Sequence, residues 1–311
     1  MRFIDAAEIN RVLTLPLLID AIAQAHRRPK IEVQDAMLGT ESQHYFVRHA
    51  VDAGRYMGSK LITSVPSNLT AGDLPAVQAV CVLFDGKDGR PLAVVDGTAI
   101  TYWRTAADSA LGSRLLSRPD VATLLVVGAG GLSRWLVRAH RTVRPSLREV
   151  LIWNRDAERG RSLARALGKD DIRAEFVADL GAAVGRADVI TTCTRSHQPL
   201  IKGEHLRPGV HLDLVGGYTE HTREADDEAA RRARIFVDRR ESAFDGVGDI
   251  LQPIASGAIK ESDVLGDLYD LIGGRVAGRQ SDAEITLFKN AGGGHFDLIA
   301  AETIYRAAGG Q

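Results

Sequence analysis

Residues 122–155 read ATLLVVGAGGLSRWLVRAHRTVRPSLREVLIWNR, and this stretch decides the fold. The apolar run Thr123–Val127 predicts a strand buried on both faces. Gly128 and Gly130 follow at once, and apolar residues then recur at helical spacing until a proline ends the pattern. A second strand is expected at Glu149–Trp153. The order of strand, glycine turn, helix and strand is the context in which a dinucleotide-binding motif carries meaning.

The glycines of this turn would bring the main chain close to a pyrophosphate. Gly128 permits the tight turn and Gly130 the close approach, while free N–H groups at the start of the helix bind the phosphates. Ser133, a small residue, stands at the third position of the motif. A purely structural turn is the alternative, but the flanking strands and helix favour a cofactor. The residues expected to hold it are Gly128, Ala129, Gly130, Gly131 and Leu132.

The end of the second strand indicates which cofactor binds. NAD sites usually carry an acid there, which accepts hydrogen bonds from the ribose. This chain has Asn154 and Arg155 instead, followed by Asp156. A guanidinium suits a 2′-phosphate, so NADP(H) is expected, with NAD(H) as the alternative. Arg155 could instead be a solvated residue at a helix start.

Strands and helices continue to alternate after this motif, which predicts a parallel sheet with right-handed crossovers. Helices are expected at 157–167 and 222–233, and strands at 188–193, 210–215 and 234–237. Ligands of such sheets bind at the carboxyl ends of the strands. Further cofactor contacts are therefore expected from Thr192, Cys193, Thr194, Val215, Gly216 and Gly217.

The first third of the chain has a different pattern. Strands are expected within 30–63, at 77–84 and at 91–95, which together predict a mostly antiparallel sheet framed by helices. Thr101 could cap the helix that follows, with Arg104 in its first turn.

Two domains are expected, and the fold class is α/β. A Rossmann-type parallel-sheet nucleotide domain is predicted at 119–287. An α+β domain for substrate binding and dimerisation is predicted at 1–118, completed by 288–311, whose terminal helix is expected to pack on it.

Composition excludes several classes of protein. Of 311 residues, 45% are hydrophobic and 25% charged, as in an ordinary globular protein. The net charge is −1 and the basic residues are dispersed, which argues against nucleic-acid binding. No apolar run approaches the ~20 residues of a membrane span, and Asp5 and Glu8 interrupt an N-terminal signal. The two cysteines lack metal-ligand spacing, so we expect no metal site and a cytoplasmic location.

Four blocks make the chain resemble the ornithine cyclodeaminase/μ-crystallin family over essentially its whole length. They are YMGSKLIT around Lys60, DGTAITYWRTAA at 96–107, the glycine turn at 127–130, and TLFKN at 286–290. The second block is long and unusual, so chance does not explain it. Family members include cyclodeaminases, alanine dehydrogenases and reductases of cyclic ketimines, and μ-crystallin also serves as a binding protein. Their substrates carry a carboxylate beside a C–N centre, to or from which a hydride moves.

The resemblance implies roles for individual residues. Lys60 and Arg104 would hold the substrate carboxylate, which suits fixed cationic donors, and Thr105 would contact the cofactor. Asp297 is expected to act as the acid near the substrate nitrogen, with His44 as the second candidate. Structural alternatives remain for each: an exposed strand lysine, an interdomain ion pair for the arginine, a first-turn helix acid, and a core or surface histidine.

One departure from the family indicates the reaction. Cyclodeaminases carry an acidic residue after the fifth Rossmann strand, where this chain has Tyr218, either a substrate contact or a packing residue. The TEHTRE segment and the FKNAGGGHFDL tail look more like members that reduce Δ1-pyrroline-2-carboxylate to L-proline, in proline metabolism or hydroxyproline degradation. The six-membered Δ1-piperideine-2-carboxylate, giving L-pipecolate, would be a second substrate. An ornithine cyclodeaminase, an alanine-type dehydrogenase and a non-catalytic NADPH- or ligand-binding protein are the alternatives. Family members are commonly dimers, so a homodimer is expected.

Overall fold

The computed structural model describes residues 1–40, 43–68 and 74–310. By their internal contacts they form two compact units: unit 1 is Met1–Thr105 with Gly292–Gln311, and unit 2 is Ala106–Ala291. The sequence placed the divisions at 118/119 and 287/288. The first falls earlier because the division lies within one continuous helix, α4 (Gly97–Leu116). The second falls later because β14 (Ile285–Lys289) pairs along its whole length with strands of unit 2.

Unit 1 contains the predicted antiparallel sheet. Its strand order among the described residues is β1-β6-β5-β4-β3-β2, and all neighbours are antiparallel except β1 and β6. The strands are β1 (Arg2–Ile4), β2 (Glu32–Thr40), β3 (Gln43–Asp52), β4 (Tyr56–Ser64), β5 (Val77–Asp85) and β6 (Pro91–Asp96).

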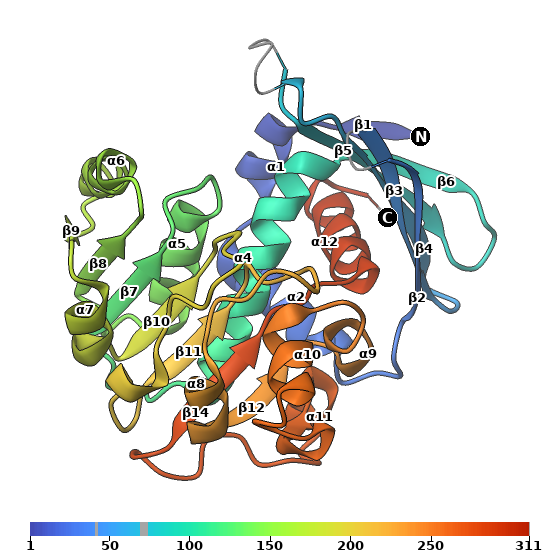
Figure 1. Cartoon of the computed structure of the whole chain (residues 1–311). Coiled ribbons are helices and arrows are strands. Elements are labelled where there is room, and N and C mark those ends of the chain that lie inside the picture. Colours follow the sequence, from blue (N-terminus) through green and yellow to red (C-terminus); the bar gives the residue numbers. More distant parts are fainter. Residues whose placement is uncertain (41–42, 69–73, 311) are drawn as a thin grey trace. The chain divides into compact units, whose positions relative to one another are not determined.

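Helices cover one face of this sheet. The C-terminal helix α12 (Gly294–Ala307) packs against β3, β4 and β5 and against α2 (Leu15–Ala25), as Figure 1 shows in red. The expectation that the terminal helix packs on the first domain is therefore confirmed. Thr14 caps α2 by accepting a hydrogen bond from the Leu17 N–H. A short helix, α1 (Ala6–Val12), precedes α2.

Unit 2 contains the predicted parallel sheet. Its order is β13-β12-β14-β11-β10-β7-β8-β9, and every pairing among the described residues is parallel. Leu125 and Val127 of β7 face one apolar cluster while Leu124 and Val126 face another, which explains the unbroken apolar run. The other strands are β8 (Glu149–Trp153), β9 (Ala174–Phe176), β10 (Val189–Thr192), β11 (His211–Leu214), β12 (Ala233–Val237) and β13 (Val264–Gly266), with β7 at Thr123–Val127.

The helices of unit 2 lie between these strands in the chain. The longest two follow β7 and β8, and Asp156 caps the second of them. The helices and 3-10 turns are α5 (Ser133–Val143), α6 (Ala157–Gly168), α7 (Leu180–Arg186), η1 (Gly203–His205), α8 (Asp227–Arg232), α9 (Arg240–Ala243), α10 (Gly248–Ala255), η2 (Glu261–Asp263) and α11 (Leu268–Ile272).

Two predicted helix starts are wrong. α4 begins at Gly97, where the Asp96 carboxylate accepts from the Ala99 N–H, so Thr101 is not its cap and Arg104 lies in its interior rather than in its first turn. The helix predicted at 222–233 is only α8, Asp227–Arg232. The preceding segment is held in a loop because Glu224 uses its main-chain carbonyl to accept from Leu200 and Ile201.

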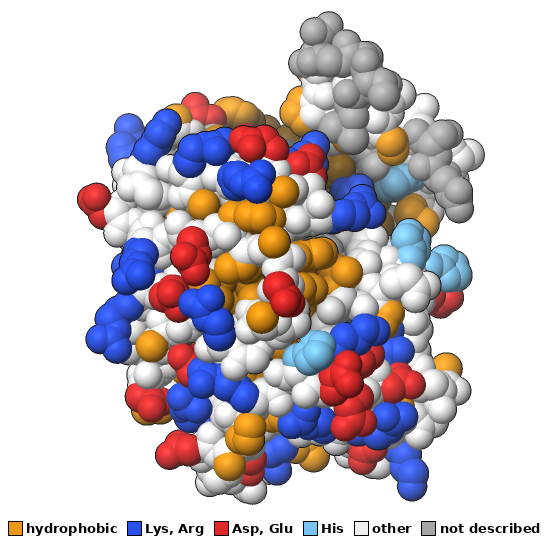
Figure 2. All heavy atoms as spheres, turned by 60° about the vertical axis from the view of Figure 1, so that its left-hand side comes forward, with side chains coloured by type: hydrophobic (Ala, Val, Ile, Leu, Met, Phe, Trp, Pro, Cys, Tyr) orange, Lys and Arg blue, Asp and Glu red, His pale blue; other side chains and the backbone are white. Residues whose placement is uncertain are grey.

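None of the helices in the described part of the chain is long and apolar enough to cross a membrane. On the face seen in Figure 2, Lys and Arg side chains lie interspersed with Asp and Glu rather than gathered in one basic patch.

Candidate functional site

Lys60 lies in the middle of β4, on the face of the sheet that α12 covers. It stands opposite Arg48 of β3 and Cys81 of β5 in the strand register, so the three side chains point to the same face. The Lys60 side chain is 2% exposed. Burial of a lysine requires a partner, and the partner comes from α12.

The ammonium of Lys60 is paired with Asp297. Its Nζ lies 2.7 Å from Asp297 Oδ1 and 3.3 Å from Thr101 Oγ1. Arg104 Nε lies 3.4 Å from the same Asp297 oxygen. Thr101, predicted as a helix cap, instead donates to the Gly97 carbonyl and accepts from Lys60. The structure therefore brings together the three residues predicted as catalytic.

Burial and the neighbouring opposite charge shift the pKa of each member of this pair in opposite directions. Burial lowers the pKa of Lys60 to about 8, although Asp297 partly offsets it. The pKa of Asp297 is lowered: its burial would raise it, but Lys60, Arg104 and Arg48 together outweigh burial. Asp297 is therefore an anion near neutral pH, and its ordinary state there is a hydrogen-bond acceptor rather than a proton donor.

Arg48 is a further cation that the sequence analysis missed. A Cβ placed on Gly292 would lie 2.8 Å from an Arg104 Nη1 and 3.4 Å from Arg48 Nη1, so both guanidinium groups reach the same point. Gly292 has φ +77°, which also favours glycine. Arg48 is bonded to Asp35 through Nε and Nη2. The only sign of Arg48 in the sequence is a basic residue within the strand predicted in the region 30–63.

Three cations act on the carboxylate of Asp297. Lys60 and Arg104 lie within ion-pair distance of it, and Arg48, which is also paired with Asp35, adds positive charge nearby. Asp297 Oδ2 is buried and has no hydrogen-bond partner among the described residues. A buried unpaired acceptor beside two converging guanidinium groups fits a small ligand that carries both an anion and an N–H donor.

Of the other two predicted substrate contacts, His44 is not brought to this group. His44 is on β3 opposite Ser64, four residues from Arg48, which places it about 13 Å along the strand. Tyr218 belongs to unit 2, where it follows β11 and its side chain is exposed.

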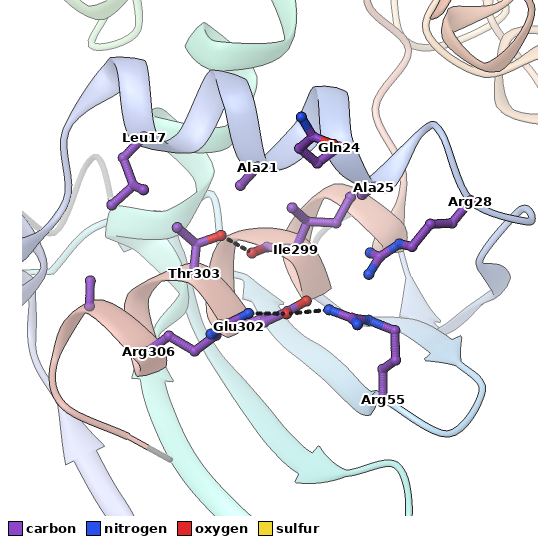
Figure 3. A pocket seen from close by; sticks show the side chains of 11 residues that line it. Leu17, Ala21, Gln24, Ala25, Arg28, Arg55, Ile299, Glu302, Thr303 and Arg306 are labelled. Carbon is purple, nitrogen blue, oxygen red and sulfur yellow. Dashed lines mark hydrogen bonds and ion pairs between the residues drawn. The ribbon is translucent and has the colours of Figure 1, made fainter. Parts of the chain in front are cut away.

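A separate pocket of about 420 Å³ lies between α2 and α12 (Figure 3). Its arginines already have acidic partners: Arg55 and Arg306 both bind Glu302, and Arg28 binds Asp52. None of Lys60, Arg104, Arg48 or Asp297 lines it. We therefore do not place the substrate there.

The predicted cofactor turn of unit 2 is tightly held. Gly128 has φ +113°, and a Cβ there would lie 2.9 Å from the Cys193 carbonyl oxygen. Its N–H donates to the Trp153 carbonyl, and the Ala129 N–H donates to Asn154 Oδ1. Asn154 thus fixes the turn through its side chain, a role that the sequence analysis did not assign.

The turn leaves room where a phosphate would bind. A Cβ on Gly130 would meet no heavy atom within 4 Å. Gly131 and Leu132 lead into α5, whose N-terminus has no side-chain cap and no acid in its first turn. Uncapped N–H groups at a helix N-terminus favour an anion, so these residues fit the pyrophosphate of a dinucleotide. Arg155, at the end of β8, is exposed.

The remaining predicted cofactor residues of unit 2 lie at the carboxyl ends of β10 and β11. Thr192 and Val215 are buried, and burial raises the pKa of the Cys193 thiol to about 12. Thr105, by contrast, is the last residue of the first segment of unit 1. Of the others, Thr194 and Gly216 are held by a buried acid described next, and Gly217 lies beside Asp249.

Glu224 is the functional candidate that the sequence analysis missed in unit 2. Its carboxylate accepts from Thr192 Oγ1, the Thr194 N–H and hydroxyl, and the Gly216 N–H. Burial, and secondly Asp249, raise its pKa. The sequence predicts a charged helix over this segment, and no local pattern distinguishes its buried Glu224 from the neighbouring acids.

Among the described residues, no group of three or more His, Cys, Asp or Glu side chains is placed to hold a metal ion.

Comparisons with known proteins show the family and the fold. Residues 19–311 match the ornithine cyclodeaminase/mu-crystallin family. A Δ(1)-pyrroline-2-carboxylate reductase of Paracoccus denitrificans is 43% identical over 94% of this chain and 92% of its own length.

Two solved structures share the fold over 99% of this chain. One is a Thermococcus litoralis Δ(1)-pyrroline-2-carboxylate reductase in complex with NADH and L-proline, with a TM-score of 0.92, 27% identity and 97% of that chain covered. The other is an archaeal alanine dehydrogenase dimer with bound NAD, also with a TM-score of 0.92 and 27% identity, and 96% of that chain covered.

Proposed function

Because the chain belongs to the ornithine cyclodeaminase/mu-crystallin family, we propose that it reduces a cyclic ketimine, Δ1-pyrroline-2-carboxylate, to L-proline with a nicotinamide cofactor. The observation that carries the proposal is the buried group of Lys60, Arg104, Arg48 and Asp297, in which three cations act on one carboxylate whose Oδ2 has no hydrogen-bond partner among the described residues. The imine supplies both complements, a carboxylate and a protonated ring nitrogen.

The two guanidinium groups beside Gly292 are the proposed carboxylate site. Planar guanidinium groups bind carboxylates through paired N–H donors, and little water competes at this depth. Arg104 is 8% exposed and the Arg48 side chain 15%. Lys60 adds positive charge from the sheet beneath. An imine without a carboxylate would lack this attraction.

Asp297 and Lys60 are the proposed groups at the substrate nitrogen. Asp297 Oδ2 would accept from the iminium N–H and so favour the protonated, electrophilic imine. Lys60, with a pKa of about 8, is the better proton source. The expected role of Asp297 as the acid is replaced by that of an acceptor, because three cations hold it ionised. A reduced nicotinamide, when bound, would supply the hydride for C2, and the π electrons of the C=N bond would become the amine lone pair.

Unit 2 is the proposed cofactor site, with the pyrophosphate at Gly128–Leu132 and the nicotinamide end at the loops after β10 and β11. We propose a preference for NADP(H) over NAD(H), because Arg155 is exposed at the end of β8 where a 2′-phosphate would lie. NAD(H) remains the second cofactor in this proposal.

A homodimer formed through the sheet of unit 1 is proposed. The face opposite Lys60 carries exposed apolar side chains from four strands, namely Phe3, Leu38, Tyr45, Val51 and Val80. Solvent-exposed apolar groups gathered on one sheet face favour association. Light scattering of wild type and of Val80→Glu tests this: a monomeric wild type would contradict it.

We also propose a cytoplasmic enzyme of proline metabolism, in which hydroxyproline degradation is one source of the imine. Both thiols, Cys81 and Cys193, are free, as expected in a reducing compartment. Fractionation of the source cells tests the location.

Product analysis tests the reaction. The protein is incubated with NADPH or NADH and either Δ1-pyrroline-2-carboxylate or Δ1-piperideine-2-carboxylate; parallel samples contain L-ornithine with NAD⁺, or pyruvate with ammonia and NADH. We expect L-proline from the five-membered imine and slower formation of L-pipecolate. Proline and ammonia from ornithine alone would identify a cyclodeaminase. Alanine as the main product would identify an alanine dehydrogenase, and tight NADPH binding without any product would identify a binding protein.

A further inference from the structure

Four hydrogen-bond donors converge on the carboxylate of Glu224. Oε2 accepts from Thr192 Oγ1 and the Gly216 N–H, each at 2.6 Å. Oε1 accepts from the Thr194 N–H at 2.6 Å and from its hydroxyl at 2.7 Å. The loop after β10 and the loop after β11 are therefore tied to one side chain.

Glu224 is itself anchored from the neighbouring strand. Its N–H donates to Asp249 Oδ1 at 2.7 Å, and Asp249 Oδ2 lies 3.0 Å from Lys289 Nζ. Lys289 is the last residue of β14, which lies beside β11 in the sheet, as β11 lies beside β10. The side chains of Lys289 and Asp249 are fully buried. A continuous polar connection thus joins the carboxyl ends of three adjacent parallel strands.

The two glycines after β11 leave the space that this polar connection occupies. A Cβ on Gly216 would lie 2.0 Å from the Thr194 carbonyl oxygen and 2.6 Å from Glu224 Oε1. A Cβ on Gly217 would lie 2.1 Å from Asp249 Oδ2. Any side chain at either position would push the loops off the buried acids.

An amide cannot replace this carboxylate. Each Glu224 oxygen receives one main-chain N–H, from Thr194 or from Gly216. A glutamine must turn its NH₂ group toward one of these N–H donors, whichever way its amide is oriented. Two donors would then face each other in a buried site, where neither can bind water.

We propose that Glu224 is a positioning residue for the nicotinamide end of the cofactor: it sets the main chain at Thr194 and Gly216, against which the ring is oriented. The inference rests on the proposed function and deepens it, because ligands of open parallel sheets bind at the carboxyl ends of the strands that Glu224 joins. Asp249 and Lys289 act behind it and touch neither substrate nor cofactor.

The test compares cofactor fragments in Glu224→Gln. Titration of the whole protein measures Kd for NADH and for ADP-ribose, which lacks the nicotinamide. We expect the Kd for NADH to rise on the order of tenfold, as for a lost hydrogen bond to a charged group, while that for ADP-ribose stays unchanged. With the imine as substrate, kcat should fall while the KM for the imine stays unchanged. Thr192→Val, which removes one donor to Oε2, should give a smaller change of the same kind.

Asp213→Asn is the matched control. Asp213 is another fully buried acid of unit 2, bonded to Ser109, Thr191 and His140. We expect it to lower Tm without changing the ratio of the two Kd values. If Glu224→Gln fails to fold, the ratio of the two Kd values in Thr192→Val still tests the proposal. An unchanged ratio in the folded variants, or equal weakening of both ligands, overturns the proposal. Because the binding measurements need no turnover, they stand even if the imine is not the substrate.

Discussion

Lys60 of β4 and Asp297 of α12 form a buried ion pair, with Nζ 2.7 Å from Oδ1 and each side chain 2% exposed. The two residues are separated by most of the chain, yet each depends on the other. Removing Asp297 would leave a buried ammonium among arginines, and removing Lys60 would remove a principal cause of the lowered pKa of Asp297. The pair holds an ionised carboxylate where a substrate nitrogen can use its second oxygen.

Activity should fall at alkaline pH as Lys60 loses its proton. Because burial lowers the Lys60 pKa to about 8, we expect kcat/KM to decline above that pH, while the Kd for NADH stays flat. Lys60→Arg separates two roles of the residue. If Lys60 supplies a proton, the variant should lose activity by orders of magnitude at every pH. A variant that stays active and merely lacks the alkaline decline would show that Lys60 provides only charge.

The same group should make stability depend on pH. Between about pH 8 and its ordinary value of 10.5, Lys60 is neutral in the folded chain and still protonated in the unfolded chain. The unfolded state then binds more protons, so the contribution of Lys60 to the free energy of unfolding rises with pH through this window. Urea unfolding of wild type and Lys60→Met at a series of pH values measures it. A difference between them that is flat or falls from pH 8 to 10.5 would contradict the assignment.

Arg155 should determine the cofactor preference. Arg155→Ala removes the guanidinium expected to bind the 2′-phosphate, so the Kd for NADPH should rise about tenfold or more while that for NADH is unaffected. Arg159→Ala is the control, since Arg159 is also exposed but is paired with Asp156, the N-cap residue of α6. Equal losses for the two cofactors would show that Arg155 does not discriminate between them.

Gly128 and Gly130 should fail for different reasons when changed to alanine. Gly128→Ala forces a side chain into φ +113° and against the Cys193 carbonyl, so Tm should fall. Gly130→Ala meets open space, so Tm should hold while the Kd for NADH rises, because the methyl group occupies the cofactor's place. Thermal melts and NADH titrations of both variants provide the check. A Gly130→Ala protein that binds NADH normally would remove the pyrophosphate from this turn.

The α/β class and both sheets could be predicted because their signals are local. The apolar run of β7 and the period change at α5 report burial directly. The start of α4 could not be placed, since Asp96 and Thr101 are both capable caps and only the tertiary contact with Lys60 decides between them. The resemblance to a family directed attention to Lys60, Arg104 and Asp297 before their pairing was visible.

The rest of the site depends on contacts between distant segments. Arg48 joins the cationic group only through strand register, and Glu224 becomes a buried acid only because Asp249 and the loop after β10 surround it. In the sequence, Glu224 is one acid in a charged run, which is typical of a solvated helix. No periodicity distinguishes it from its neighbours.

Transfer of the hydride itself is the most direct test of the account. The protein is incubated with Δ1-pyrroline-2-carboxylate and a reduced nicotinamide nucleotide that carries deuterium at C4, in separate samples for each face of the ring. The product is analysed by mass spectrometry and NMR. We predict L-proline with one deuterium at C2 from the cofactor labelled on one face of the ring, and unlabelled L-proline from the cofactor labelled on the other face. Absence of deuterated proline from both, under conditions where the cofactor binds, would contradict imine reduction by this chain.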